Sequence, residues 1–371
     1  MKQSMLEAEE NVTATPAFAP AVSCHNEWDP LEEVVVGVID GAAVPAWDIT
    51  LAATMPAGQH AFFAERCGQP FPAERVAAAR RNLEELVHIL EAEGVTVRRP
   101  DPIDFARPYK TPDWASPGGL YAAMPRDLLL VVGDEIIETP MAWRSRYFEV
   151  HAFRTLLKDY FRRGARWTSA PRPELVDALY DPAALANDDP EGFRSILTEH
   201  EPTFDAADFV RCGKDLFVQR SHVTNAFGIE WLRRHLGAGY RIHEVSLRDA
   251  HPMHIDASLM PLAPGKLLIN PERVPHTPEI FRSWDVMEAP PPEVSAGRTF
   301  YMCSPWVSMN VLMLDPERVL VERHEQTLMR RLRDWGFQPI PCSFADFYAF
   351  GGSFHCATLD VRRRGELLSY F

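Results

Sequence analysis

The sequence predicts an α/β fold in which a unit of β-hairpin, α-helix and β-strand recurs and closes into a ring. Three observations lead to this prediction. Hairpin patterns with glycine or proline at a tight turn occur at four places. A helical pattern follows three of them. A last strand near the C-terminus has no partner nearby in the sequence, but in a ring it can pair with the first strand. The alternative is an α/β protein of two domains.

The first part of the chain begins with a buried strand over 32–38. Residues 40–72 are rich in proline, glycine and aromatic side chains, which predicts long surface loops. An apolar stripe at helical spacing, followed by Gly94, predicts an amphipathic helix over 73–94, and a strand follows over 95–97. Residues 101–117 form a second loop that is rich in proline.

The four hairpins span 127–139, 208–219, 256–270 and 307–322. Helices are predicted over 147–163, over 225–236 and in a segment that ends at Trp335. Further strands are predicted over 240–247 and 338–342, and proline-rich insertions at 171–190 and 290–292. The opening strand and the C-terminal strand together supply a fifth unit.

Composition excludes two classes of partner. The chain has 371 residues with 38 Lys and Arg against 52 Asp and Glu, a formal net charge of −14, so it lacks the basic face that nucleic acids require. No apolar run approaches the roughly 20 residues that span a bilayer. The six cysteines are widely spaced and no export signal is evident, so we expect reduced thiols and a cytoplasmic protein. Residues 1–22 are predicted to be a flexible tail and residues 23–371 a single domain.

A lone cysteine after a glycine-rich turn is the strongest candidate for chemistry. Gly351 and Gly352 permit a sharp turn ahead of Cys356, and residues 357–361 alternate as in a short strand. Such a turn can present a thiol as a nucleophile. The alternative is a small buried cysteine in a core strand.

Polar residues stand at or near the starts of the predicted hairpins, namely Asp127, Asp205, Asp208, Asp256, Ser304 and Asn310. A single carboxylate at such a place is usually a cap or a turn residue. In a ring, however, equivalent strand ends converge on the axis. These side chains would then form an acidic pocket for a cationic ligand.

His254 and Asp256 lie two residues apart in an extended segment, so their side chains share one face. Three interpretations are open at this point. His254 is a hydrogen-bonded histidine within a strand, or a metal ligand in a facial triad for iron that a distant histidine such as His222 completes, or the proton carrier for Cys356.

Several long motifs resemble the amidinotransferases. They are residues 24–34 (CHNEWDPLEEV), 110–114 (KTPDW), 124–127 (MPRD), 138–146 (ETPMAWRSR), 204–208 (FDAAD), 253–256 (MHID) and 352–363 (GSFHCATLDVRR). The likeness is strongest to the arginine:glycine amidinotransferases and extends to the inosamine-phosphate amidinotransferases. It implies the fold of that family, a five-bladed α/β propeller (pentein) with pseudo-fivefold ββαβ units, which agrees with the repeat described above.

The resemblance also implies a reaction. Cys356 matches the family's nucleophile, His254 its general acid and base, and Asp205 the carboxylate that partners this histidine. Carboxylates can grip the planar guanidinium of L-arginine and present its central carbon to the sulfur. The cysteine takes the amidino group, L-ornithine leaves, and a primary amine accepts the group in a ping-pong cycle. Neither a metal nor an organic cofactor is implied.

Further positions match the family's substrate pocket. They are Asp127 and Asp256 for the guanidinium, Arg273 and Ser304 for the substrate carboxylate, Tyr121 and Met253 in the pocket. His251 stands where the glycine-specific branch tends to have asparagine, and Cys303 where it has serine. These departures leave the acceptor open. Glycine is our first expectation, and lysine or another amine of natural-product assembly is the alternative.

The sequence thus predicts an L-arginine:amine amidinotransferase that acts on small molecules, with a homodimer as the assembly to test. Two rivals are kept. One is an arginine deiminase-like hydrolase, in which water takes the place of the acceptor. The other is a protein that binds arginine-like cations without chemistry, against which the intact set of Cys356, His254 and Asp205 argues.

Overall fold

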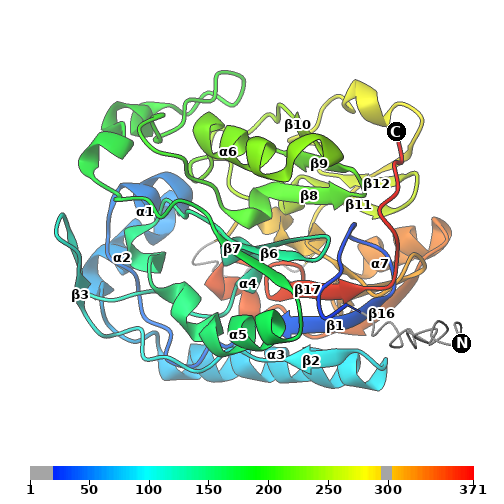
Figure 1. Ribbon diagram of the computed structural model, residues 1–371, viewed down its shortest axis with the longest axis horizontal. Coiled ribbons are helices and arrows are strands. Elements are labelled where there is room, and N and C mark those ends of the chain that lie inside the picture. Colours follow the sequence, from blue (N-terminus) through cyan, green and yellow to red (C-terminus); the bar gives the residue numbers. More distant parts are fainter. Residues whose placement is uncertain (1–19, 294–302) are drawn as a thin grey trace, which may run out of the picture.

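The computed structural model describes residues 20–293 and 303–371 (Figure 1). The predicted tail therefore lies almost wholly outside the described residues. Within the described ranges no helix is long and apolar enough to cross a membrane. All six cysteines lie in these ranges, where they are free thiols.

Three-stranded sheets carry the fold, and five of them share one pattern: an antiparallel pair with a third strand parallel to one member of the pair. They are β17-β1-β2 (Thr358–Arg363, Leu31–Val36, Thr96–Arg98), β5-β6-β7 (Leu129–Val132, Glu135–Glu138, Arg166–Ser169), β8-β9-β10 (Phe209–Cys212, Asp215–Val218, Arg241–Glu244), β11-β12-β13 (Leu259–Ala263, Lys266–Ile269, Asp285–Glu288) and β14-β15-β16 (Leu312–Met313, Arg318–Glu322, Gln338–Cys342). The α/β class is confirmed.

Helices connect the second and third strands of four of these sheets. They are α3 (Ala73–Ala92), α5 (Arg154–Arg162), α6 (Ala226–Leu236) and α7 (Gln326–Asp334). The β11-β12-β13 unit has a 3₁₀ turn, Glu279–Phe281, where the others have a helix. In α3 the apolar stripe is buried and Gly94 has φ +82° at the end of the helix, as its pattern predicts.

The first and last strands pair, as predicted. Val34 faces Asp360 and Val36 faces Thr358 in the antiparallel register of β1 and β17. Figure 1 shows β17 in red beside β1 in blue, with α3 along the same side of the molecule. Since β17 begins two residues after Cys356, this pairing fixes the position of the cysteine.

Two sequence predictions about helices need correction. Residues 40–72 are not only loops, because they contain α1 (Ile49–Thr54) and α2 (His60–Arg66). The side chain of Asp48 accepts hydrogen bonds from the backbone N–H groups of Thr50 and Leu51 and so caps α1. The helix predicted over 147–163 starts as a 3₁₀ turn, and α5 begins only at Arg154.

Two further short elements are α4 (Pro125–Leu128) and the two-stranded β3-β4 sheet (Tyr109–Lys110, Ala115–Ser116). The β3-β4 sheet lies within the predicted loop 101–117. Strands β7 and β13 were not predicted, since in each the outer two residues are exposed and the inner two half-buried, which gives no clear periodicity.

Gly228→Ala should destabilise the protein, because a Cβ at this position in α6 would lie 2.2 Å from the carbonyl oxygen of Thr203. Overpacking of this kind costs about 1–3 kcal/mol in the free energy of unfolding. The matched control is Gly239→Ala, where a Cβ would meet nothing within 4 Å. Urea unfolding measures both variants, and equal midpoints would contradict the packing described here.

Candidate active site

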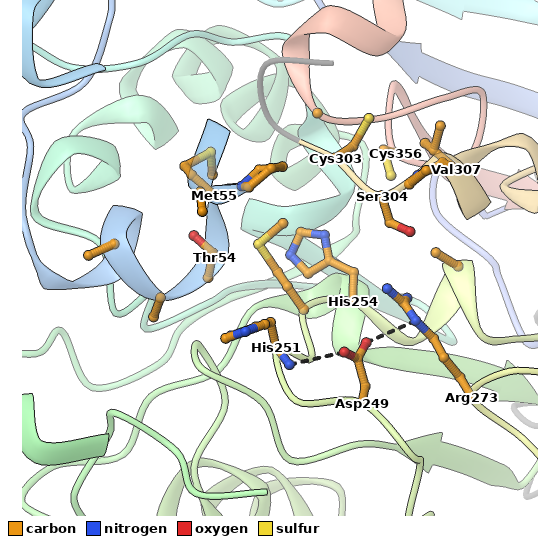
Figure 2. A pocket seen from close by; sticks show the side chains of 18 of the residues that line it. Thr54, Met55, Asp249, His251, His254, Arg273, Cys303, Ser304, Val307 and Cys356 are labelled. Carbon is orange, nitrogen blue, oxygen red and sulfur yellow. Dashed lines mark hydrogen bonds and ion pairs between the residues drawn. The ribbon is translucent and has the colours of Figure 1, made fainter. Parts of the chain in front are cut away.

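A cavity of about 450 Å³ opens beside Cys356. Figure 2 shows the sulfur of Cys356 and the imidazole of His254 facing it, while Met55 and Thr54 from the α1 segment form another wall. Eight of the predicted site residues line the cavity: His251, Met253, His254, Asp256, Arg273, Cys303, Ser304 and Cys356. The convergence predicted for residues far apart in the sequence is confirmed for these positions.

Cys356 is buried, with 4% of its surface exposed. Its backbone N–H donates to Asn310 Oδ1 (3.1 Å), and its Sγ lies 3.7 Å from Asp256 Oδ2. The turn before it requires glycine at two positions. Gly351 has φ +93°, and a Cβ on Gly352 would lie 2.7 Å from the Cβ of Cys356.

The Cys356 thiol is neutral at pH 7 in this environment. Burial raises its pKa, the carboxylates of Asp256 and Asp127 raise it further, and His254 opposes them, with a result of about 12. A group with so high a pKa becomes a nucleophile only after its surroundings change.

His254 stands in a strained backbone conformation, with φ +63°. Such strain costs about 1–3 kcal/mol and tends to occur at functional sites. Its backbone N–H donates to Asp208 Oδ1 (3.0 Å), its Nε2 lies 3.1 Å from Asp205 Oδ2, and its Nδ1 lies 3.7 Å from Asp127 Oδ1. These contacts hold the imidazole at the cavity wall.

The imidazole of His254 is positively charged at neutral pH. Burial would lower its pKa, but Asp127, Asp205 and the Cys356 thiol raise it well above the ordinary value. Burial raises the pKa of Asp205 to about 6, against the opposing effect of His254. The site therefore holds a cationic acid next to a neutral thiol.

Asp127 lies behind the cavity on α4. Its Oδ2 accepts from Arg146 Nη1 (2.8 Å), and Arg146 also binds Glu149 (2.8 Å). Within the described residues, its Oδ1 has no hydrogen-bond partner. This oxygen lies 3.7 Å from His254 Nδ1, so Asp127 faces the imidazole and is not part of the cavity lining.

Tyr121 does not line the cavity, contrary to the prediction. Its side chain is buried, and its Oη donates to the carbonyl of Phe350 (2.9 Å). The guanidinium of Arg146 lies 5.6 Å from the centre of its ring. Tyr121 supports the wall from behind instead of facing a ligand.

Arg273 also lines the cavity, and Figure 2 shows its side chain joined to Asp249. Its Nε donates to Asp249 Oδ2 (2.9 Å) and its Nη1 donates to Ser258 Oγ (3.3 Å). Ser304 lies on the same cavity, where its Oγ accepts from the backbone N–H of Trp306 (3.3 Å). A guanidinium and a hydroxyl here can bind a carboxylate.

Three further residues of the cavity lining differ in exposure and in their contacts. His251 is half-exposed, and its Nε2 lies 3.2 Å from Asp188 Oδ1. The Cys303 thiol donates to the carbonyl of Tyr348 (3.1 Å), and burial raises its pKa well above the ordinary value. Met253 is half-buried among them.

Known proteins resemble the chain along nearly its whole length. An L-arginine:L-lysine amidinotransferase of Pseudomonas savastanoi pv. phaseolicola is 54% identical over 94% of this chain and 96% of the relative. The mitochondrial glycine amidinotransferase of Danio rerio is 48% identical over 100% of this chain and 89% of the relative. No family model matches the chain.

Two solved structures of amidinotransferases are also similar to this chain. An amidinotransferase of the saxitoxin biosynthetic pathway of Microseira wollei has a TM-score of 0.88 at 52% identity, covering 95% of this chain and 100% of that one. The inosamine-phosphate amidinotransferase of Streptomyces griseus has a TM-score of 0.86 at 40% identity, covering 95% and 99%.

The chain belongs to the amidinotransferase family. It is therefore an enzyme of the class that transfers amidino groups, and the resemblance identified in the sequence is confirmed. The fold of this amidinotransferase is that of the family's solved members.

The amidinotransferase does not bring the iron ligands of the alternative interpretation together. The ring of His222 packs 6.0 Å from that of His251, and its Nδ1 accepts from the backbone N–H of Ile196. Among residues 20–293 and 303–371, no group of three or more His, Cys, Asp or Glu side chains could hold a metal ion. The iron site is not supported.

Some site residues of this amidinotransferase were not singled out from the sequence. Met55 and His60 line the cavity from a segment that was predicted to be a loop. The cap at Asp48 was the signal that could have revealed it. Arg146, His355 and Glu27 stand inside the family motifs, but the motifs alone gave them no role.

Proposed function

We propose that this amidinotransferase moves the amidino group of L-arginine to a primary amine through a covalent amidino-Cys356, with release of L-ornithine. One observation carries the proposal: a buried thiol, a charged imidazole and carboxylates meet at one cavity. Asp256 Oδ2 lies 3.7 Å from the sulfur, and His254 is held between Asp205 and Asp127. This set suits a planar cation that is attacked at its central carbon.

In the first step Asp256 binds the guanidinium and the buried charge of Asp127 behind the cavity adds to its attraction, while Arg273 and Ser304 bind the α-carboxylate. A guanidinium keeps its charge at neutral pH. Its arrival beside the sulfur stabilises the thiolate, so the pKa of Cys356 falls and the thiol loses its proton to solvent.

In the second step the thiolate attacks the central carbon and a bond forms between carbon and sulfur. The bond from that carbon to the chain nitrogen breaks, and His254 gives its proton to this nitrogen. L-Ornithine leaves. His254, now neutral and held by Asp205, then takes a proton from the acceptor amine, which attacks the amidino carbon and releases the thiolate.

For the acceptor, we propose lysine ahead of glycine. Lysine carries an α-carboxylate and a terminal amine at nearly the spacing of arginine, so Arg273 can hold both substrates in one way. A relative at 54% identity acts on lysine by its name, and this supports the choice.

The test is a panel of primary amines, each incubated with L-arginine while ornithine is measured. The expected result is at most one equivalent of ornithine per enzyme with arginine alone and continued ornithine release only with an amine, fastest with lysine. Citrulline from arginine without any amine would instead indicate the hydrolase. Neither product, together with tight arginine binding, would indicate a binding protein.

We also propose that the five sheets form a closed five-bladed propeller and that residues 23–371 are one domain. The shared strand pattern and the pairing of β1 with β17 support this. The cavity also takes side chains from residue 52 to residue 356. A cytoplasmic location and a homodimer stay predictions, and gel filtration with light scattering tests the latter.

Without substrate, alkylation of Cys356 by iodoacetamide should rise about tenfold per pH unit up to pH 10, because a thiol with a pKa of about 12 does not reach a plateau there. Peptide mapping follows Cys356 and uses the exposed Cys67 as the internal control. Asp256→Asn removes a charge that raises this pKa, so it should increase the rate at pH 8. A plateau below pH 8 in the unmodified enzyme would contradict the neutral thiol.

Arg273→Gln should raise the KM for L-arginine about 10–100-fold with a smaller change in kcat, because it removes the charged fork for the α-carboxylate. Agmatine, which lacks this carboxylate, is the matched substrate. The variant should lose the preference for arginine over agmatine. A preserved preference would show that the carboxylate is bound elsewhere.

A further inference from the structure

His355 directly precedes Cys356 but does not line the cavity. Its side chain is 2% exposed. Its Nδ1 lies 2.7 Å from Asp256 Oδ2, and its Nε2 lies 3.1 Å from Glu27 Oε2. The imidazole therefore bridges two buried carboxylates, one of which belongs to the candidate active site.

The carboxylate of Asp256 contacts both the His355 imidazole and the Cys356 sulfur. The same Oδ2 that faces His355 lies 3.7 Å from Cys356 Sγ. Burial would raise the pKa of Asp256, but the hydrogen bond and charge of His355 hold it below the ordinary value. The carboxylate that faces the sulfur is thus ionised, and its contact with His355 fixes its orientation.

Glu27 is held from the other side by arginines. Arg211 Nε donates to its Oε1 (2.8 Å) and Arg211 Nη2 to its Oε2 (2.7 Å), with Arg126 Nη1 at 3.4 Å. Burial would raise the pKa of Glu27, but these arginines and His355 bring it well below the ordinary value. Glu27 is therefore an ionised acceptor at a fixed position.

The two arginines that bind Glu27 also contact other parts of the chain. Arg126 and Arg211 both bind Asp360 as well, at 2.8 and 3.1 Å, and Arg126 Nε donates to the carbonyl of His355 (2.7 Å). These residues come from α4, β8 and β17. Both ring nitrogens of His355 thus lie within hydrogen-bond distance of a carboxylate oxygen.

We propose that His355 is a positioning residue for amidino transfer: its Nδ1–H holds the Asp256 carboxylate toward Cys356 and the cavity, and Glu27 holds the ring for that task. The inference rests on the proposed function, in which Asp256 binds the guanidinium. His355 touches no reacting atom. Its effect passes through Asp256 alone.

Two substitutions of His355 test the contacts of its two ring nitrogens separately. The amide nitrogen of asparagine takes the place of Nδ1, so His355→Asn keeps a donor to Asp256 and loses the contact with Glu27. The amide nitrogen of glutamine takes the place of Nε2, so His355→Gln does the reverse. We expect His355→Gln to lower kcat/KM for arginine about 100-fold and His355→Asn about tenfold or less.

A double-mutant cycle tests whether the effect passes through Asp256. In an Asp256→Asn background, His355→Gln should lower kcat/KM by less than about threefold, because the group it positions has already changed. Residues that act independently would give the full 100-fold loss in both backgrounds. Additivity would therefore overturn the proposal, as would equal losses in the glutamine and asparagine variants.

Thermal unfolding of each variant accompanies the kinetics. A merely structural role predicts activity losses that follow the loss of stability, with no dependence on which nitrogen is replaced. Should His355→Gln not fold, His355→Asn carries the test, and a loss above about 30-fold in that variant would overturn the proposal. Failure of the unmodified enzyme to release ornithine would instead reject the proposed function, so the two failures are distinguishable.

Discussion

Cys356→Ala should abolish ornithine release from L-arginine, with kcat lowered by at least about 10⁴-fold. Without the sulfur no covalent intermediate can form, and the free amine would have to attack a delocalised cation that is a poor electrophile. Ornithine is measured in the presence of lysine, at a protein concentration high enough to detect the residual rate. The variant should still bind arginine, since the carboxylates and Arg273 remain.

The matched control is Cys67→Ala, which removes an exposed thiol that is not part of the cavity lining. It should retain full activity. A Cys356→Ala variant that still turns over within tenfold of the unmodified enzyme would show that the amidino group passes directly to the amine, or through another residue such as Cys303.

His254→Gln should lower kcat about 10²–10⁴-fold, because the nitrogen that leaves arginine must be protonated as its bond to carbon breaks. The pKa of His254 is raised well above the ordinary value, which supplies an acid at neutral pH. Glutamine keeps the polarity of the side chain but cannot give up a proton. Ornithine formation in a single turnover measures this step.

A substrate with a better leaving group provides the control for this variant. S-Methylisothiourea presents the same planar cation but releases a thiol, which needs less help from an acid. In a single turnover, measured as release of methanethiol, His254→Gln should therefore lose much less activity with it than with arginine. Equal losses with both substrates would mean that His254 holds the substrate or the sulfur in place and is not the acid.

Local sequence patterns were sufficient to predict the antiparallel hairpins of most of the sheets. Hairpins such as β5-β6 and β8-β9 have short apolar strands around a glycine turn, and this signal lies within about a dozen residues. The pairing of β1 with β17 was predicted only because an unpaired final strand is costly. Periodicity gave no such help for β13 or for α1 and α2.

The sequence predicted which residues form the candidate site, but it did not predict which of them contact one another. The motifs identified Cys356, His254 and Asp256, and the cavity brings them together. They could not show that Tyr121 bonds to Phe350, because that contact joins residues 229 positions apart.

The roles of Arg146 and His355 could not be predicted either, because their contacts also join residues that are distant in the sequence. Arg146 neutralises one side of Asp127, and His355 fixes Asp256 from behind. Both contacts depend on how separate strands and turns meet at the centre of the molecule. A charged residue inside a motif looks alike in the sequence whether it faces a ligand or another side chain.

The mass of the intact protein after incubation with L-arginine alone shows whether the amidino group passes through the sulfur. We expect a gain equal to one amidino group, located on the Cys356 peptide, absent in Cys356→Ala and lost again when lysine is added. An unchanged mass under conditions in which the enzyme turns over arginine and lysine, or an adduct on another residue, would contradict a route through the sulfur.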